Sequence, residues 1–115
     1  LKKGGELIMG TPNMGSCISK VFKSYWYNLD TPRHIFLFSP YTLKNLLIQQ
    51  DIYPTSVEYV SAGGILGSLQ YLINDIFKKK IDLIHKQWLV IMLYPIERVL
   101  DLFKLGDVFV MRAKI

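Results

Sequence analysis

The fold is decided by residues 1–13, Leu1-Lys2-Lys3-Gly4-Gly5-Glu6-Leu7-Ile8-Met9-Gly10-Thr11-Pro12-Asn13. The adjacent glycines permit positive φ angles, so they can turn an arriving chain sharply into a strand. Residues 7–9 form a short apolar run, typical of a strand covered on both faces in a parallel sheet. Residues 11–13 end that strand with turn chemistry. Because such a strand needs neighbours on both sides and no start methionine precedes it, we expect part of a larger domain.

Composition limits the classes of protein to consider. The 115 residues, 50% of them hydrophobic, suit one small domain or part of one. The net charge of +5 suits an anionic partner, but the basic residues are scattered apart from Lys78-Lys79-Lys80, and no DNA- or RNA-binding signature accompanies them. We therefore expect no nucleic acid partner. The single cysteine, Cys17, excludes an internal disulfide and agrees with a cytoplasmic location, and no metal-ligand pattern is present.

The remaining segments alternate between helical and strand patterns. We expect a long loop over 14–38, partly helical around 16–25, a helix over 39–51 begun by Ser39-Pro40, and a half-buried strand over 56–61. A helical insertion over 65–105 follows, with helices over 65–77 and 81–103, the second interrupted or kinked at Pro95, and a last strand over 107–114. Helices between strands indicate the α/β class. A loop as long as 14–38 is typical of a lid over a binding site.

Three segments of the chain carry a family resemblance. Residues 1–7 resemble a Leu-Lys-Pro-Gly-Gly turn into a fifth strand, with Lys3 where proline is usual. Residues 29–34, Leu29-Asp30-Thr31-Pro32-Arg33-His34, with the helix that follows, resemble a Pro-Arg-His lid, and residues 106–114 resemble a closing strand. In this order the segments resemble the C-terminal half of class I S-adenosylmethionine-dependent methyltransferases, in particular small bacterial members. The resemblance covers almost the whole chain and is weakest over 65–105.

The resemblance implies a fold and a cofactor. The chain would hold the fifth, sixth and seventh strands of a Rossmann-like methyltransferase sheet, with the helical insertion before the last strand. S-adenosylmethionine would be the cofactor, but its main binding motifs, a glycine-rich loop and an acidic residue after earlier strands, cannot be located in this chain. The glycines at 63, 64 and 67 follow a late strand and indicate a bend instead. Asp51 stands where the family commonly has a glycine, and aspartate tolerates the left-handed conformation required there.

The resemblance also places residues 13–34 over the substrate. Methyl transfer needs an aligned acceptor and often a base, and His34 is the candidate base because an imidazole exchanges protons near neutral pH. The alternative for His34 is a lid residue that bonds backbone or packs on an aromatic ring. The candidate substrate-binding residues are Asn13, Tyr25, Trp26, Asp30 and Arg33. Alternatively, Arg33 pairs with Asp30 to hold the loop, and the aromatic residues pack. His85 is expected to be solvated or interfacial.

The insertion contains a nine-residue apolar run over 88–96, far short of the roughly 20 residues needed to span a bilayer. Lysines at 78–80 and 86, with Trp88 and Tyr94, flank it, as in an amphipathic element that reaches anionic lipid. The alternatives are a cap over the sheet or a dimer face.

The sequence therefore predicts methyl transfer from S-adenosylmethionine to a small-molecule or lipid-linked acceptor. The chain alone is expected to be inactive, because the cofactor motifs lie outside it. The alternative function is a non-enzymatic membrane-peripheral or protein-interaction module built on residues 65–105, with peripheral membrane contact through 78–96. The acceptor and the oligomeric state stay open.

Overall fold

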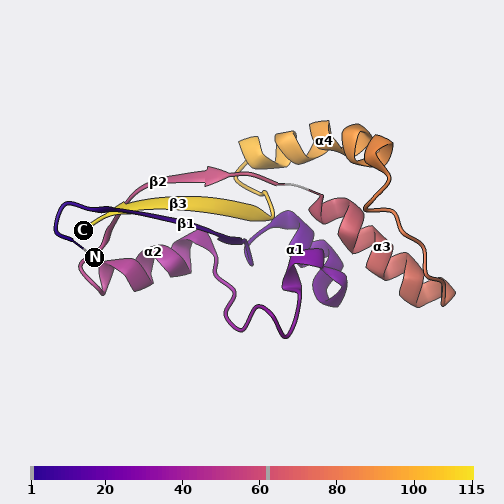
Figure 1. Cartoon of the computed structure of the whole chain (residues 1–115), viewed down its shortest axis with the longest axis horizontal. Coiled ribbons are helices and arrows are strands. Elements are labelled where there is room, and N and C mark those ends of the chain that lie inside the picture. Colours follow the sequence, from indigo (N-terminus) through magenta and orange to yellow (C-terminus); the bar gives the residue numbers. More distant parts are fainter. Residues whose placement is uncertain (1, 62) are drawn as a thin grey trace.

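Three strands form one sheet in the computed structural model, which describes residues 2–61 and 63–115 (Figure 1). The central strand, β3 (Val108–Lys114), is antiparallel to both β1 (Glu6–Pro12) and β2 (Tyr53–Tyr59). The outer strands β1 and β2 consequently run parallel to each other. The expectation of a mixed α/β fold is confirmed. Leu1, which begins the expected turn, and Ala62, which precedes the glycine pair, lie outside the described residues.

One face of the sheet carries the hydrophobic core. Helix α2 (Pro40–Ile48) packs Leu43 and Leu47 against this face, where alternate residues of β3 are fully buried. These β3 residues are Phe109, Met111 and Ala113, and the register places Leu7 and Met9 of β1 beside Ala113 and Met111. Burial of these side chains is the main stabilising contribution available to so small a sheet.

Strand β1 is covered on one face, which corrects the expectation of a strand buried on both. Leu7 and Met9 pack on the core, whereas Ile8, between them, is 54% exposed. Successive side chains of a strand point to opposite faces. Since α2 and the core lie on one face, Ile8 points away from them within this chain.

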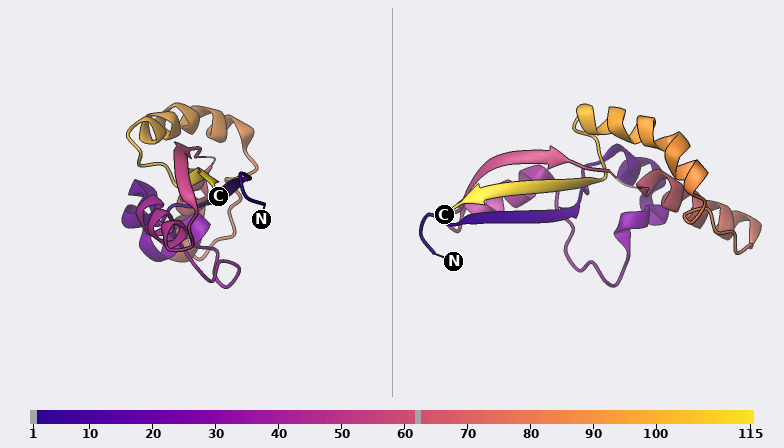
Figure 2. Two further views of the ribbon diagram at one scale, coloured as in Figure 1. Left: turned by 90° about the vertical axis from the view of Figure 1, so that its left-hand side faces the viewer. Right: turned by 45° about the horizontal axis from the view of Figure 1, so that its top comes forward.

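The other helices gather beyond the ends of β1 and β2, at the opposite end of the molecule from the two termini (Figures 1 and 2). They are α1 (Cys17–Phe22), the short 3₁₀ turns η1 (Lys23–Tyr25) and η2 (Tyr27–Leu29), α3 (Gly64–Phe77) and α4 (Gln87–Leu102). This arrangement makes the chain elongated, with extents of 52 × 28 × 21 Å. The carboxyl ends of the two parallel strands therefore open into the helical part, where residues 14–38 lie.

Several helix boundaries follow the signals read from the sequence. The Ser39 side chain accepts a bond from the backbone N–H of Thr42, and the Thr42 hydroxyl accepts one from the N–H of Ser39, so the expected helix start is confirmed. Helix α2 ends at Ile48, three residues before the expected boundary, and Asp51 adopts the positive φ, +57°, expected for it. The expected helix over 65–77 is α3.

The expected starts of two other elements were wrong. Strand β2 begins at Tyr53 and not at residue 56; it is an edge strand of this sheet, where Pro54 is tolerated. Residues 81–86 are not helical, because side chains of α3 bind their backbone. The Asn74 side chain bonds both N–H and C=O of Ile81, and Gln70 Oε1 accepts from two successive N–H groups beyond it.

Helix α4 begins at Gln87 and continues through Pro95, so the expected interruption does not occur. Pro95 is on the exposed side of the helix, where the cost is one missing backbone hydrogen bond. Across the described residues, none of the helices combines the length and the apolar character needed to cross a membrane.

We predict that Leu47→Ala lowers the free energy of unfolding by about 2–5 kcal/mol, because it opens a cavity against β3. The control is Leu46→Ala on the same helix, where the side chain is 44% exposed against 6% for Leu47. That substitution should cost within about 0.5 kcal/mol. Urea denaturation of both variants measures the difference. Equal losses would contradict the assignment of the core to this face.

Candidate functional site

Asn13 joins the end of β1 to the start of β3. Its backbone N–H donates to the carbonyl of Asp107 at 2.7 Å, and its side-chain amide donates to the carbonyl of Gly106 at 2.8 Å. The amide oxygen accepts from the N–H of Gly15 at 2.9 Å, and the residue is 1% exposed. Both ends of the amide are thus bonded within the fold. Substrate binding by Asn13 stays a prediction, and the structure gives the residue a positioning role where residues 14–38 begin. These residues keep the name lid, after the role expected for them.

Ser61 likewise joins the end of β2 to the start of β3. Its hydroxyl donates to Asp101 Oδ1 at 2.6 Å and accepts from the N–H of Asp107 at 3.0 Å. Its N–H donates to the other carboxylate oxygen of Asp101 at 3.1 Å, and Arg98 donates to its carbonyl while pairing with Asp101 at 2.7 Å. The insertion is therefore tied to the strand ends by charged groups of α4.

Asp107 lies between these two residues and is 1% exposed. Its Oδ2 accepts a 2.6 Å bond from the Asn28 side chain in η2, while the buried Oδ1 has no partner among the residues that the structure describes. Burial raises the pKa of the Asp107 carboxyl; the Ser61 hydrogen bond opposes the rise, and the neighbouring Glu97 and Asp101 charges add to it. Asp107 links the lid to the last strand.

Carboxylates of the chain itself occupy the start of α3 after the glycine pair. A Cβ on Gly64 would meet Asp107 Oδ2 at 1.5 Å, and the N–H of Gly63 already donates to Glu97 Oε2 at 3.0 Å. Two carboxylates of the chain thus lie at the start of α3, where a cofactor phosphate or carboxylate would otherwise bind. The expectation of a bend, and not a cofactor loop, agrees with this packing.

A small polar cavity of about 100 Å³ collects three of the residues proposed for the site, Asp30, Arg33 and His34. Tyr27, Asn28 and Tyr71 complete its lining. Arg33 pairs with Asp30 at 3.6 Å, as the structural alternative for Arg33 expected, with the arginine side chain 83% exposed. The Nδ1 atom of His34 is buried and has no hydrogen-bond partner within residues 2–61 and 63–115. Its backbone N–H donates to the carbonyl of Asp30, so the lid turn holds the histidine in place.

A larger apolar hollow of about 510 Å³ is lined by other residues of the lid, between residues 14 and 29. Met14, Trp26 and Leu29 contribute its apolar lining, and Lys20 and Lys23 also border it. Trp26 is 2% exposed, with an indole N–H that lacks a partner in the described part of the chain. Trp26 and Leu29 line this hollow, whereas Tyr27, Asn28 and Asp30 line the polar cavity. Neighbouring residues in and around η2 therefore contribute to the walls of both cavities.

The other candidates lie away from these cavities. The Tyr25 hydroxyl donates to Asp75 of α3 at 2.5 Å, which raises the pKa of Tyr25 and lowers that of Asp75. Tyr25 thus fastens the lid to α3. His85 is exposed and pairs with Asp82 at 2.6 Å, as expected for a solvated residue. Within residues 2–61 and 63–115, no three His, Cys, Asp or Glu side chains form a group that could hold a metal ion.

Sequence reasoning missed Asp107 and the apolar hollow. Asp107 had one local signal, an acidic residue placed directly before an apolar strand, but its partners Ser61 and Asn28 are 46 and 79 residues away in the chain. Comparison of the chain with family models, with curated proteins and with solved structures gave no match.

We predict that Asp107→Asn changes the pH dependence of stability. The folded-state pKa of Asp107 is raised, so ionisation of this group costs the native protein stability as pH rises from the unfolded value, about 3.9, through the folded one. The asparagine variant has no such cost. Its free energy of unfolding, relative to wild type, should therefore increase between about pH 4 and pH 7.

Urea denaturation at several pH values measures this difference. Asp82→Asn is the control, because the exposed Asp82 has its pKa lowered by the hydrogen bond to His85, so its contribution changes below about pH 4 and the relative stability of that variant should stay nearly level between about pH 4 and pH 7. A relative stability of Asp107→Asn that stays level or falls with rising pH contradicts the prediction.

Proposed function

We propose that the chain is the C-terminal part of a class I S-adenosylmethionine-dependent methyltransferase and supplies the acceptor side of its site. In this proposal β1, β2 and β3 are the fifth, sixth and seventh strands of a Rossmann-like sheet. The observation that carries it is the position of the polar cavity. Asp30, Arg33 and His34 meet in the lid that follows β1, beside Tyr71 of the helix that follows β2. Ligands of open α/β sheets bind beyond the carboxyl ends of parallel strands.

The described residues do not fit the cofactor itself. The glycines that follow β2 are closed by Glu97 and Asp107, as described above. We therefore assign S-adenosylmethionine to sequence outside this chain and assign no cofactor contact to its residues.

His34 is the proposed base. It lines the polar cavity, and its Nδ1 has no hydrogen-bond partner among the described residues, so this nitrogen is left to take a proton from an acceptor hydroxyl or amine that enters the cavity. The backbone bond to Asp30 and the Asp30–Arg33 pair keep this turn of the lid in place. Arg33, largely exposed, can also face an anionic group of the acceptor.

The acceptor is proposed to carry an apolar part. The 510 Å³ hollow is large enough for a small apolar group, and ligand sites combine such surfaces with a few polar contacts. A small-molecule and a lipid-linked acceptor both satisfy this description.

The second candidate, a non-enzymatic membrane-peripheral or interaction module, is favoured by one observation. The outward side of α4 is apolar and exposed, with Ile91 at 71% and Leu102 at 82%. The two candidates differ in whether the full-length protein consumes S-adenosylmethionine, and radiolabelled methyl transfer to lipid and small-molecule extracts of the source cells separates them. Absence of any labelled product would favour the second.

We predict that the 115-residue chain does not bind S-adenosylmethionine more tightly than about 1 mM, because its glycine turn is filled by carboxylates. Isothermal titration of the chain measures this, with the full-length natural protein as the positive control. Tight binding by the chain would contradict the assignment of the cofactor site to other sequence.

In the full-length protein, His34→Ala and His34→Gln should each lower turnover about 100-fold or more at saturating cofactor, because the acceptor loses its base. His85→Gln is the matched control, since His85 is exposed and lines neither cavity. It should leave turnover unchanged. Labelled-methyl transfer measures the rates, and near-wild-type turnover in both His34 variants would contradict the proposed role.

A further inference from the structure

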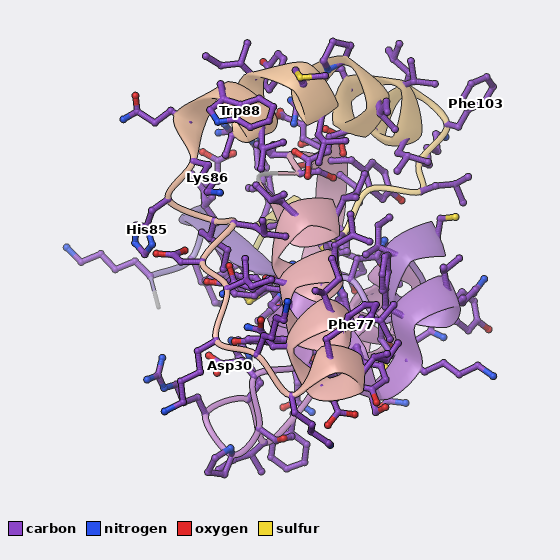
Figure 3. All side chains as sticks on the ribbon, turned by 90° about the vertical axis from the view of Figure 1, so that its right-hand side faces the viewer. Asp30, Phe77, His85, Lys86, Trp88 and Phe103 are labelled. Carbon is purple, nitrogen blue, oxygen red and sulfur yellow. The ribbon has the colours of Figure 1, made fainter. Side chains whose placement is uncertain are left out.

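The exposed side of α4 is apolar along its whole length. Its members are Trp88, Ile91, Met92, Pro95, Ile96, Val99 and Leu102, with Phe103 just beyond the helix, and the non-proline members are 50–82% exposed. Their spacing places them within about 140° of the helix circumference. Figure 3 shows Trp88 and Phe103 at opposite ends of the helix. We call this set of eight residues the outer face of α4.

The opposite side of α4 carries its acidic residues. Glu97 is 3% exposed and accepts from Gly63, and Asp101 accepts from Ser61. Rotating the helix to bury the outer face would break the hydrogen bonds between these carboxylates and the N–H groups of Ser61 and Gly63. Buried polar groups without partners are costly in free energy. The outward direction of the apolar side is therefore fixed by the hydrogen bonds on the other side.

The charge around the outer face is positive. Lys86 precedes α4 and Lys104 follows it, and both are exposed (Figure 3 labels Lys86). The two acidic residues of α4, Glu97 and Asp101, point inward, so no anion of this helix lies on the outer face. An apolar strip between lysines, with tryptophan near one end, matches the interfacial region of an anionic bilayer.

A second copy of the chain fits this face less well. The 16-residue helix is roughly 24 Å long and carries one lysine beyond each of its ends. Pairing of two outer faces would bring lysines together, Lys86 against Lys86 or against Lys104, depending on direction. Charge thus favours an anionic lipid surface over self-association.

We propose that the outer face of α4 docks the protein on an anionic membrane surface. The helix lies in the plane of the interface, inserts its apolar side chains among the lipids, and keeps Lys86 and Lys104 at the level of the headgroups. This inference does not depend on methyl transfer, because no residue of the outer face lines either cavity.

Co-sedimentation of the full-length natural protein with phosphatidylcholine vesicles containing about 30% phosphatidylglycerol tests the proposal. At about 0.05 M NaCl the wild-type protein should bind these vesicles, and at about 0.5 M NaCl binding should weaken at least tenfold, since salt screens the lysines. Lys86→Gln with Lys104→Gln should weaken binding about tenfold at low salt. No binding of the wild-type protein at low salt would overturn the proposal.

A matched pair of double variants tests the surface itself. Ile91→Gln with Leu102→Gln removes two exposed apolar groups from the outer face and should weaken vesicle binding at least tenfold. Tyr41→Gln with Leu46→Gln removes exposed groups from α2 and should bind as wild type does. All four side chains are exposed, so thermal melting should show both variants folded. Equal loss of binding in the two double variants would overturn the proposal.

Sedimentation velocity without vesicles tests the competing occupant. The proposal expects the same oligomeric state for the wild-type protein and for Ile91→Gln with Leu102→Gln. A dimer present in the wild type and abolished in that variant would assign the outer face to a second copy and overturn membrane docking.

Discussion

The rest of the structure depends on the hydrogen bonds that join the ends of the three strands. Asn13 follows β1, Ser61 follows β2 and Asp107 precedes β3. Each of the three is nearly inaccessible to solvent. Asn13 and Ser61 each form hydrogen bonds with the segment that begins β3. These bonds satisfy polar groups that would otherwise be buried without a partner. The sheet, the lid and the insertion all begin or end at this junction. Its geometry therefore sets where the lid cavity lies relative to the parallel strands.

The elements that the sequence predicted well are those specified by neighbouring residues. The reciprocal bonds of Ser39 and Thr42 start α2, and Asp51 supplies the left-handed residue after it, within a few positions of one another. The errors arose where groups far away in the sequence determine the local structure. Residues 81–86 stay outside the helices because Gln70 and Asn74 bind their backbone, and helical periodicity contains no sign of such bonds. Likewise, exposure of Ile8 depends on which face α2 covers.

The candidate site divides in the same way. Asp30, Arg33 and His34 share one turn of the lid, so their meeting in a cavity could be predicted from their closeness in sequence. The role of Asp107 could not be predicted in this way, because its partners Asn28 and Ser61 come from segments far away in the chain. A carboxyl with a raised pKa behind the lid is thus a product of the tertiary fold. Its bond to Asn28 ties residues 27–29 to the strand junction.

The direction of the insertion follows from the junction as well. An amphipathic helix normally buries its apolar side, and periodicity alone would place the outer face of α4 against the sheet. Here the start of α3 and the N–H of Ser61 need acceptors, and Glu97 and Asp101 provide them from the polar side of α4. The requirement to pair buried polar groups thus overrides the preference to bury apolar ones. The apolar side is left exposed between two lysines, where a membrane surface can cover it without disturbing any bond of the junction.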